Sequence, residues 1–194
     1  MAYRHGFKSE ANAIAREVRA ELGLTSLSRL DPLALSAHLE IPILPLSSFA
    51  ADAPLAVEHF TQIETGSFSA CTVFDGARRA IVHNDAHSPG RQASDLAHEL
   101  AHALLLHEPT AAIGDRGCRL WNQNIEDEAQ WLAGALLVTE DAALWIARGG
   151  ATVSDAARML GVSKPMINYR LNVTGARKRI ARGRHLRVVP KPDT

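Results

Sequence analysis

Four apolar residues recur at helical spacing near the start of the chain: Ala13, Ile14, Val18 and Leu22. They predict an amphipathic helix over residues 9–22, and Gly23 follows where a helix C-cap belongs. Asp31 and Pro32 then form an N-cap and first-turn pair, which predicts a second helix over residues 32–39. The first part of the chain is therefore expected to be helical.

The middle of the chain has the pattern of strands. Residues 68–74 and 79–83 are rich in β-branched and aromatic side chains, and an Asp-Gly pair between them favours a tight turn. This predicts an antiparallel hairpin. Residues 41–46 are apolar but interrupted by two prolines, so we expect an edge strand or an extended connector there. Residues 47–65 are weakly patterned and are predicted to form a loop.

Two stronger helical patterns follow. Ser88 and Pro89 form an N-cap and first-turn pair for a helix that is expected to continue to residue 107. Residues 110–122, which contain glycines and mixed charge, are predicted to form a loop. The next helix is expected to begin near Asn124. Its apolar residues repeat along one face: Ile125, Ala129, Leu132, Ala133, Leu136 and Leu137.

The C-terminal part reads as a helix over 154–160, a glycine turn over 161–163 that ends in a serine cap, and a helix over 164–171. This is the order of a helix-turn-helix. We therefore predict an α+β fold, mainly helical with a small antiparallel sheet, and three parts: a body over 1–150, a helix-turn-helix-like module with a basic tail over 151–187, and a disordered tail over 188–194.

Charge is distributed unevenly, although the net charge is zero and the 46% of hydrophobic residues suffices for a core. Residues 1–157 carry 11 Lys and Arg against 20 Asp and Glu, whereas residues 158–194 carry 10 against the single Asp193. This asymmetry favours an anionic partner for the tail, either nucleic acid or the acidic body itself; the alternative is a solvated terminus. The residues that could contact DNA bases or phosphates are Lys164, Asn168, Arg170, Arg177, Lys178, Arg179, Arg182, Arg184 and Arg187.

Composition also bears on location. Cys71 and Cys118 lack the C-x-x-C spacing, and residues 1–16 lack the apolar core of a signal peptide. No segment approaches the roughly 18 consecutive apolar residues that a membrane-spanning helix needs. We therefore expect a reduced, cytoplasmic protein that makes no membrane contact.

The candidate chemistry is an H-E-x-x-H motif on the helix that contains residues 95–106. His98 and His102 are four residues apart, so both project from one helix face and could bind one metal ion. Glu99 is offset around the helix, where it could take a proton from a water held by the metal. The alternative is that both histidines are hydrogen-bonded core residues. A catalytic zinc needs three protein ligands, so a third must be found.

Glu126 is a candidate for that third ligand because it borders the apolar face that contains Ala129 and Ala133, and these small residues let another helix approach closely. The alternative is that Glu126, Asp127 and Glu128 only complement the helix dipole, which we prefer for the last two. His83, His87 and His107 flank the motif and are expected at the surface or behind the ligands. Tyr169, His83 and His87 are open candidates for a donor to a tetrahedral oxyanion.

Two stretches, residues 91–102 and 125–137, together resemble the ImmA/IrrE family of bacterial metallopeptidases. That family carries H-E-x-x-H on one helix and E-x-E-A-x-x-F-A-x-x-L-L-M-P on a later one. The resemblance implies that Glu126, the first glutamate of the second motif, is the third zinc ligand. Leu132 stands for the usual Phe and Val138-Thr139 for Met-Pro; these departures affect packing and the helix end. Further matches are Glu128, Ala129, Ala133, Leu136 and Leu137.

The resemblance covers roughly residues 10–172 and implies a zincin-like domain of the gluzincin type, with a small sheet against the active-site helix. Several members cleave a helix-turn-helix repressor. The resemblance therefore implies a zinc-dependent (Zn²⁺) endopeptidase that cleaves a helix-turn-helix repressor or an antitoxin-like regulator, and a role in transcription regulation. In that family a similar helical pair after the zinc domain serves to pack or to grip a protein. Two alternatives stay open: a DNA-binding regulator with structural zinc, and a module that binds a repressor without cutting it.

Overall fold

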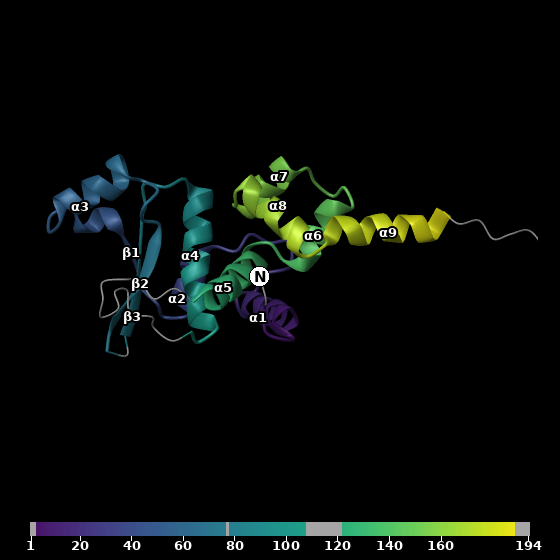
Figure 1. Ribbon diagram of the computed structural model, residues 1–194, viewed down its shortest axis with the longest axis horizontal. Helices are drawn as coiled ribbons and strands as arrows, with labels where there is room; N and C mark the ends of the chain where they lie inside the picture. The colour runs from purple at the N-terminus through teal and green to yellow at the C-terminus, as the bar shows by residue number, and fades with distance from the viewer. Residues whose placement is uncertain (1–2, 77, 108–121, 189–194) are drawn as a thin grey trace, which may run out of the picture.

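The structure is a computed structural model that describes residues 3–76, 78–107 and 122–188, with side chains described as far as Arg182 (Figure 1). Two predicted segments, the loop over 110–122 and the tail over 188–194, fall almost entirely outside the described residues. The helices are α1 (Phe7–Glu21), α2 (Pro32–His38), η1 (Leu46–Phe49), α3 (Pro54–Glu58), η2 (His59–Ile63), α4 (Pro89–Leu104), α5 (Gln123–Leu137), α6 (Glu140–Ala147), α7 (Val153–Leu160), α8 (Lys164–Val173) and α9 (Ala176–Val188).

The predicted hairpin is present as β2 (Ala70–Asp75) and β3 (Arg78–His83), which pair antiparallel with Thr72 opposite Ile81. The sheet is nevertheless mixed, because β1 (Ile43–Pro45) lies parallel to β3 and gives the order β1-β3-β2. The prediction of an antiparallel sheet was thus incomplete, while the edge-strand interpretation of residues 41–46 is confirmed. In the described part of the chain, β2 forms the opposite edge.

The first four predicted helices are present as α1, α2, α4 and α5: α1 and α5 were predicted from apolar spacing, and α2 and α4 from their capping residue and proline. Asp31 does cap α2, because it accepts a hydrogen bond from the backbone N–H of Leu33. Two boundaries differ. Asn122, not Asn124, is the N-cap of α5, since its side chain accepts from the N–H of Asn124. The metal-motif helix ends at Leu104, and Leu106 then turns the chain with a φ of 53°.

The prediction of a loop over residues 47–65 was wrong. The segment forms most of η1, then α3 with Pro54 in its first turn, then the π-helical turn η2. No residue of α3 or η2 is buried, so these helices need no apolar stripe and leave no periodic pattern in the sequence. The helices α6 and α9 were not predicted either; α6 is short and α9 is strongly basic.

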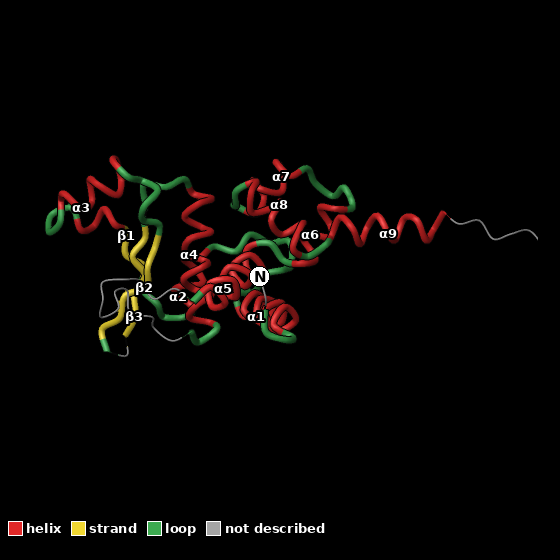
Figure 2. The backbone as a smooth tube through the Cα atoms, in the orientation of Figure 1, coloured by secondary structure: helices red, strands yellow, loops and turns green. Residues whose placement is uncertain are grey.

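The core lies around α5, which packs against α1, α4 and α8. Figure 2 shows the strands on one side of α4 and the helices α7, α8 and α9 on the other. Every residue from Trp131 to Thr139 is buried. Two buried arginines cap the end of α5: Arg19 donates to the carbonyl of Leu136 at 2.6 Å, and Arg170 donates to the carbonyl of Val138 at 2.8 Å.

The predicted helix, glycine turn and capped helix near the C-terminus are present as α7 and α8. Gly161 ends α7 in the left-handed conformation, and Ser163 caps α8 by accepting from the N–H of Met166. Arg170, considered above as a DNA contact, is 0% exposed and packs over the ring of Trp131, so that interpretation was wrong. In the described part of the chain, no helix is both long and apolar enough to span a membrane.

Candidate metal centre

The structure brings three ligand-type side chains together from two helices. His98 and His102 lie one turn apart on α4, and Glu126 lies in the first turn of α5. Nε2 of His98 lies 3.1 Å from Nε2 of His102 and 3.1 Å from Oε2 of Glu126, and Nε2 of His102 lies 3.7 Å from that oxygen. Within the described ranges this is the one group of histidine, cysteine or acidic side chains whose ligand atoms gather closely enough for a metal ion.

Small residues make this geometry possible. Ala97 and Ala101 of α4 and Ala129 and Ala133 of α5 are fully or nearly fully buried, so the two helices approach closely behind the ligands. The ligand side chains themselves keep 21–24% of their surface exposed, which leaves them accessible from solvent. Two imidazoles and one carboxylate fit a catalytic zinc site, which uses three protein ligands and keeps one position open.

The electrostatics of Glu126 agree with a ligand role. Burial alone would raise the pKa of its carboxyl group, but the neighbouring imidazoles of His102 and His98 outweigh burial and lower the pKa to about 2. Glu126 is therefore a carboxylate at neutral pH, which is the form that binds a cation.

Glu99, next to His98 on α4, contacts the sheet. Its Oε2 accepts a hydrogen bond of 2.6 Å from the hydroxyl of Thr72 on β2. This hydrogen bond orients the Glu99 carboxylate and connects α4 to the edge strand β2. Sequence analysis did not identify Thr72, because its partnership with Glu99 depends on how the sheet packs against α4.

The other flanking residues have separate roles. His107 follows α4, and its Nδ1 lies 3.0 Å from Nδ1 of His102, on the side of that ring away from Glu126. Nε2 of His107 lies 3.7 Å from Oε2 of Glu128. Of the three flanking histidines, His107 is thus the one in contact with a ligand side chain, whereas His83 and His87 are buried near the start of α4.

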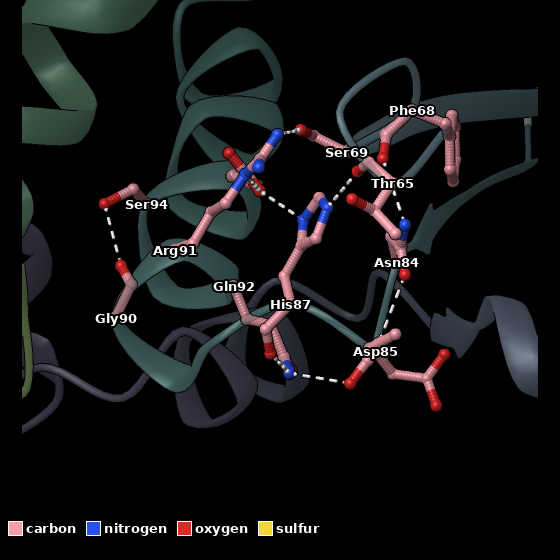
Figure 3. A network of polar contacts seen from close by, with 12 residues as sticks. Thr65, Phe68, Ser69, Asn84, Asp85, His87, Gly90, Arg91, Gln92 and Ser94 are labelled. Atoms are coloured by element: carbon pink, nitrogen blue, oxygen red, sulfur yellow. Dashed lines mark hydrogen bonds and ion pairs between the residues drawn. The ribbon is translucent and has the colours of Figure 1, made fainter. Parts of the chain in front are cut away.

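Figure 3 shows the polar network at the start of α4. Nε2 of His87 donates to the carbonyl of Thr65 at 2.7 Å, while its Nδ1 faces Asp95 at 3.4 Å. Asn84 donates to the carbonyls of Phe60 and Phe68. These contacts anchor the α3 and η2 segment to the sheet and to α4.

The candidate oxyanion donors are not brought to the ligand group by any contact that the described residues show. His87 is engaged with Thr65 and Asp95, and Tyr169 packs its ring where a side chain at Gly134 would lie. Burial raises the pKa of the Tyr169 hydroxyl to about 12.

A helix with two histidines and a glutamate, a second helix that supplies a carboxylate, and a small sheet beside them define a metallopeptidase-like domain. The comparison with family models agrees: residues 55–172 match the peptidase M78 family, described as the IrrE N-terminal-like domain. The chain belongs to this family of zinc metallopeptidases, which confirms the resemblance to ImmA/IrrE proteins noted above. No curated protein matches the chain.

Proposed function

We propose that this protein is a zinc-dependent endopeptidase in which His98, His102 and Glu126 hold the metal and Glu99 is the general base. The observation that carries the proposal is the convergence of three ligand atoms from α4 and α5, which all lie within 4.8 Å of one another. Zinc, when bound, supplies the Lewis acidity that peptide hydrolysis needs.

We assign the following roles to the protein's own groups. Glu99 accepts a proton from the attacking water and returns it to the nitrogen of the leaving amine. The hydroxyl of Thr72 donates to one oxygen of Glu99 and so leaves the other oxygen to take up the proton. Thr72 is a positioning residue in this scheme, because it acts through Glu99.

The sheet supports an extended peptide as the substrate. β2 carries Thr72 and forms the edge of the described sheet, and an edge strand can pair with a peptide through backbone hydrogen bonds. Val73 and Phe74 on the same strand are 44% and 41% exposed. Together with the family resemblance, this favours a protein substrate of the helix-turn-helix repressor class and hence a role in transcription regulation inside the cell.

The decisive variant is Glu99→Gln, because glutamine is nearly the same shape but cannot act as a base. We expect zinc content and fold to be retained while cleavage of the substrate falls by about 10²–10⁴-fold. A candidate repressor incubated with wild type and variant, and followed by gel electrophoresis and mass spectrometry, measures this. Equal cleavage by both proteins would refute the assigned role.

A contact with nucleic acid is a second candidate, favoured by the basic residues of α9. Arg177, Lys178 and Arg182 are exposed, although Arg177 also donates to Asn168. Phosphate contacts would make binding fall steeply with salt. A gel shift with duplex DNA between low and physiological salt tests this, with Arg182→Gln and Lys178→Gln expected to weaken binding; no shift at low salt would eliminate the candidate.

A further inference from the structure

We propose that His107 and Glu128 are positioning residues that fix the tautomer and orientation of the metal ligand His102. This inference rests on the proposed metal site, and it extends that site from three residues to a chain of contacts that ends at Arg4. It concerns the metal affinity of the protein as well as its catalysis.

The first step is the tautomer of His102. Its Nε2 faces the ligand group, at 3.1 Å from Nε2 of His98 and 3.7 Å from Oε2 of Glu126, so Nε2 is the atom that would bind a cation. A neutral imidazole carries one hydrogen, and binding through the Nε2 lone pair leaves that hydrogen on Nδ1. Nδ1 of His102 is therefore a donor.

The second step is the acceptor. Nδ1 of His107 lies 3.0 Å from Nδ1 of His102, and the two rings are held edge to face with their planes 69° apart. Because one of two facing nitrogens must accept, Nδ1 of His107 is the acceptor and its hydrogen is on Nε2. That Nε2–H lies on the side of Glu128, whose Oε2 is 3.7 Å away.

Glu128 is held in turn. Its Oε1 lies 3.3 Å from Nε of Arg4, so the chain of contacts runs from Arg4 through Glu128 and His107 to His102. The side chains of His107 and Glu128 are only 11% and 13% exposed, whereas Arg4 is 51% exposed. The two central members are thus shielded from water, where a hydrogen bond orients a ring more firmly than at the surface.

The backbone supports the same role. Leu106 adopts a φ of 53°, an unfavourable conformation for a residue with a side chain, and its own side chain is 81% exposed. This turn lets the N–H of His107 donate to the carbonyl of His102 at 3.0 Å and returns the imidazole over the preceding helical turn. Leu106 gains no burial from this geometry, whereas His107 gains its contact with His102.

The two histidine ligands differ in this respect. Nδ1 of His98 is buried and has no hydrogen-bond partner among the described residues, while Nδ1 of His102 has His107. Partners behind a ligand typically contribute 10–100-fold to metal affinity. We therefore expect the loss of His107 to be felt in zinc binding even though His107 does not touch the metal.

The test compares His107→Leu with His107→Asn, which have side chains of nearly equal size. Leucine removes the acceptor, whereas the Oδ1 of asparagine lies close to the position of the histidine Nδ1. We expect the zinc dissociation constant, measured by competition with a chelator, to rise about 10–100-fold for His107→Leu and by clearly less for His107→Asn. Glu128→Gln should give a smaller rise, since it keeps an acceptor but loses the charge.

The matched control is His38→Leu, which removes a histidine that pairs with Glu21 at 2.9 Å on the surface and should leave zinc affinity unchanged. The melting temperature of the metal-free proteins separates folding from binding, and the absorption bands of the Co²⁺-loaded proteins report the orientation of His102. If His107→Leu does not fold, Glu128→Gln decides: a zinc dissociation constant equal to that of wild type would then overturn the inference.

Failure of this inference can be distinguished from failure of the proposed function. Zinc affinities of His107→Leu and wild type within twofold of each other would overturn this inference and leave the proposed function intact. Equal losses for leucine and asparagine would also overturn it, because they would show a packing effect. Wild-type protein that takes up no zinc would overturn the proposed function and this inference together.

Discussion

At its N-terminal end α5 carries Glu126 and Glu128, which keep 24% and 13% of their side-chain surface exposed and contact the histidines. At its C-terminal end the same helix is wholly buried, and its last carbonyls accept hydrogen bonds from Arg19 and Arg170. We call the buried C-terminal end the rigid end and the partly exposed N-terminal end the open end. The rigid end fixes the position of the open end, because a helix held at one terminus and packed along α4 cannot shift its first turn. Changes at the two ends should therefore affect different properties.

The largest effect on stability is expected for Arg19→Met. Arg19 is 2% exposed and donates to the carbonyls of Leu136, Thr25 and Ser28, so its loss leaves several acceptors without a donor. We expect the free energy of unfolding to fall by about 3 kcal/mol. Chemical denaturation of the metal-free protein measures this.

Arg170→Met is the matched control for that variant. Arg170 donates to one carbonyl, while its two terminal nitrogens are buried without a partner among the described residues. Burial lowers the pKa of its guanidinium group to about 10. Methionine relieves this cost, so the loss should be clearly smaller than for Arg19→Met. A loss of unfolding free energy larger than that of Arg19→Met would contradict this expectation.

At the open end, Glu126→Ala should weaken zinc binding by at least about a hundredfold, because one of the three proposed ligands is lost. Isothermal titration with zinc measures this, with Asp127→Ala as a control. Asp127 adjoins Glu126 but accepts from Gln123 instead of a histidine. If Asp127→Ala weakens zinc binding as much as Glu126→Ala does, the assignment of Glu126 as a ligand is wrong.

Gly134→Ala tests the close packing of the rigid end. A Cβ at this position would lie 2.9 Å from Cδ of Arg170 and 3.0 Å from the Tyr169 ring, both of which are held between helices. We expect a loss of about 1–3 kcal/mol, although alanine favours a helix by about 1 kcal/mol. A thermal melt that shows stabilisation would mean that α8 can move away from α5.

The smallest effect is expected for Asn122→Ala at the start of α5. Its side chain accepts from the N–H of Asn124, and loss of such a cap costs about 0.5–1 kcal/mol. Because the cap lies one turn before Glu126, zinc affinity should fall slightly as the first turn frays. Serine is also a good N-cap residue, so Asn122→Ser should keep the stability and the zinc affinity of wild type. If Asn122→Ser keeps the stability but loses zinc affinity, the cap does not explain the effect on zinc binding.

Sequence alone predicted α1 and α5 from their apolar faces, which are buried, and predicted the other expected elements from caps and turns: Asp31 for α2, Ser88 for α4, the Asp-Gly pair for the hairpin of β2 and β3, and the glycine turn between α7 and α8. Glu126 became a candidate because it borders the apolar face that contains Ala129 and Ala133, and the family resemblance then implied the same residue. The parallel pairing of β1 with β3 was not predicted, since it joins segments almost 40 residues apart and has no local signal. The helices α3 and η2 were missed because they bury nothing.

The positions of two side chains, Arg170 and His107, could not be predicted from the sequence, and the physical reason is related. Arg170 was considered for DNA because positive charge usually lies at the surface, yet it is buried over Trp131. The contact of His107 with His102 depends on the left-handed turn at Leu106, and leucine gives no indication of such a turn in a sequence. In both cases tertiary packing overrode the ordinary preference of the residue type.

The close approach of Gly90 to the turn between α7 and α8 has a consequence for how the chain is made. A Cβ at Gly90 would lie 3.1 Å from the backbone nitrogen of Ser163, so the first turn of α4 rests on a segment that is synthesised much later. About 44 residues separate Glu126 from Arg170. At roughly 5–20 residues per second a ribosome needs about 2–9 s to cover that distance. During this interval His98, His102 and Glu126 are already in the nascent chain, but the residues that pack against α4 and α5 from α8 and the turn before it have not all been synthesised.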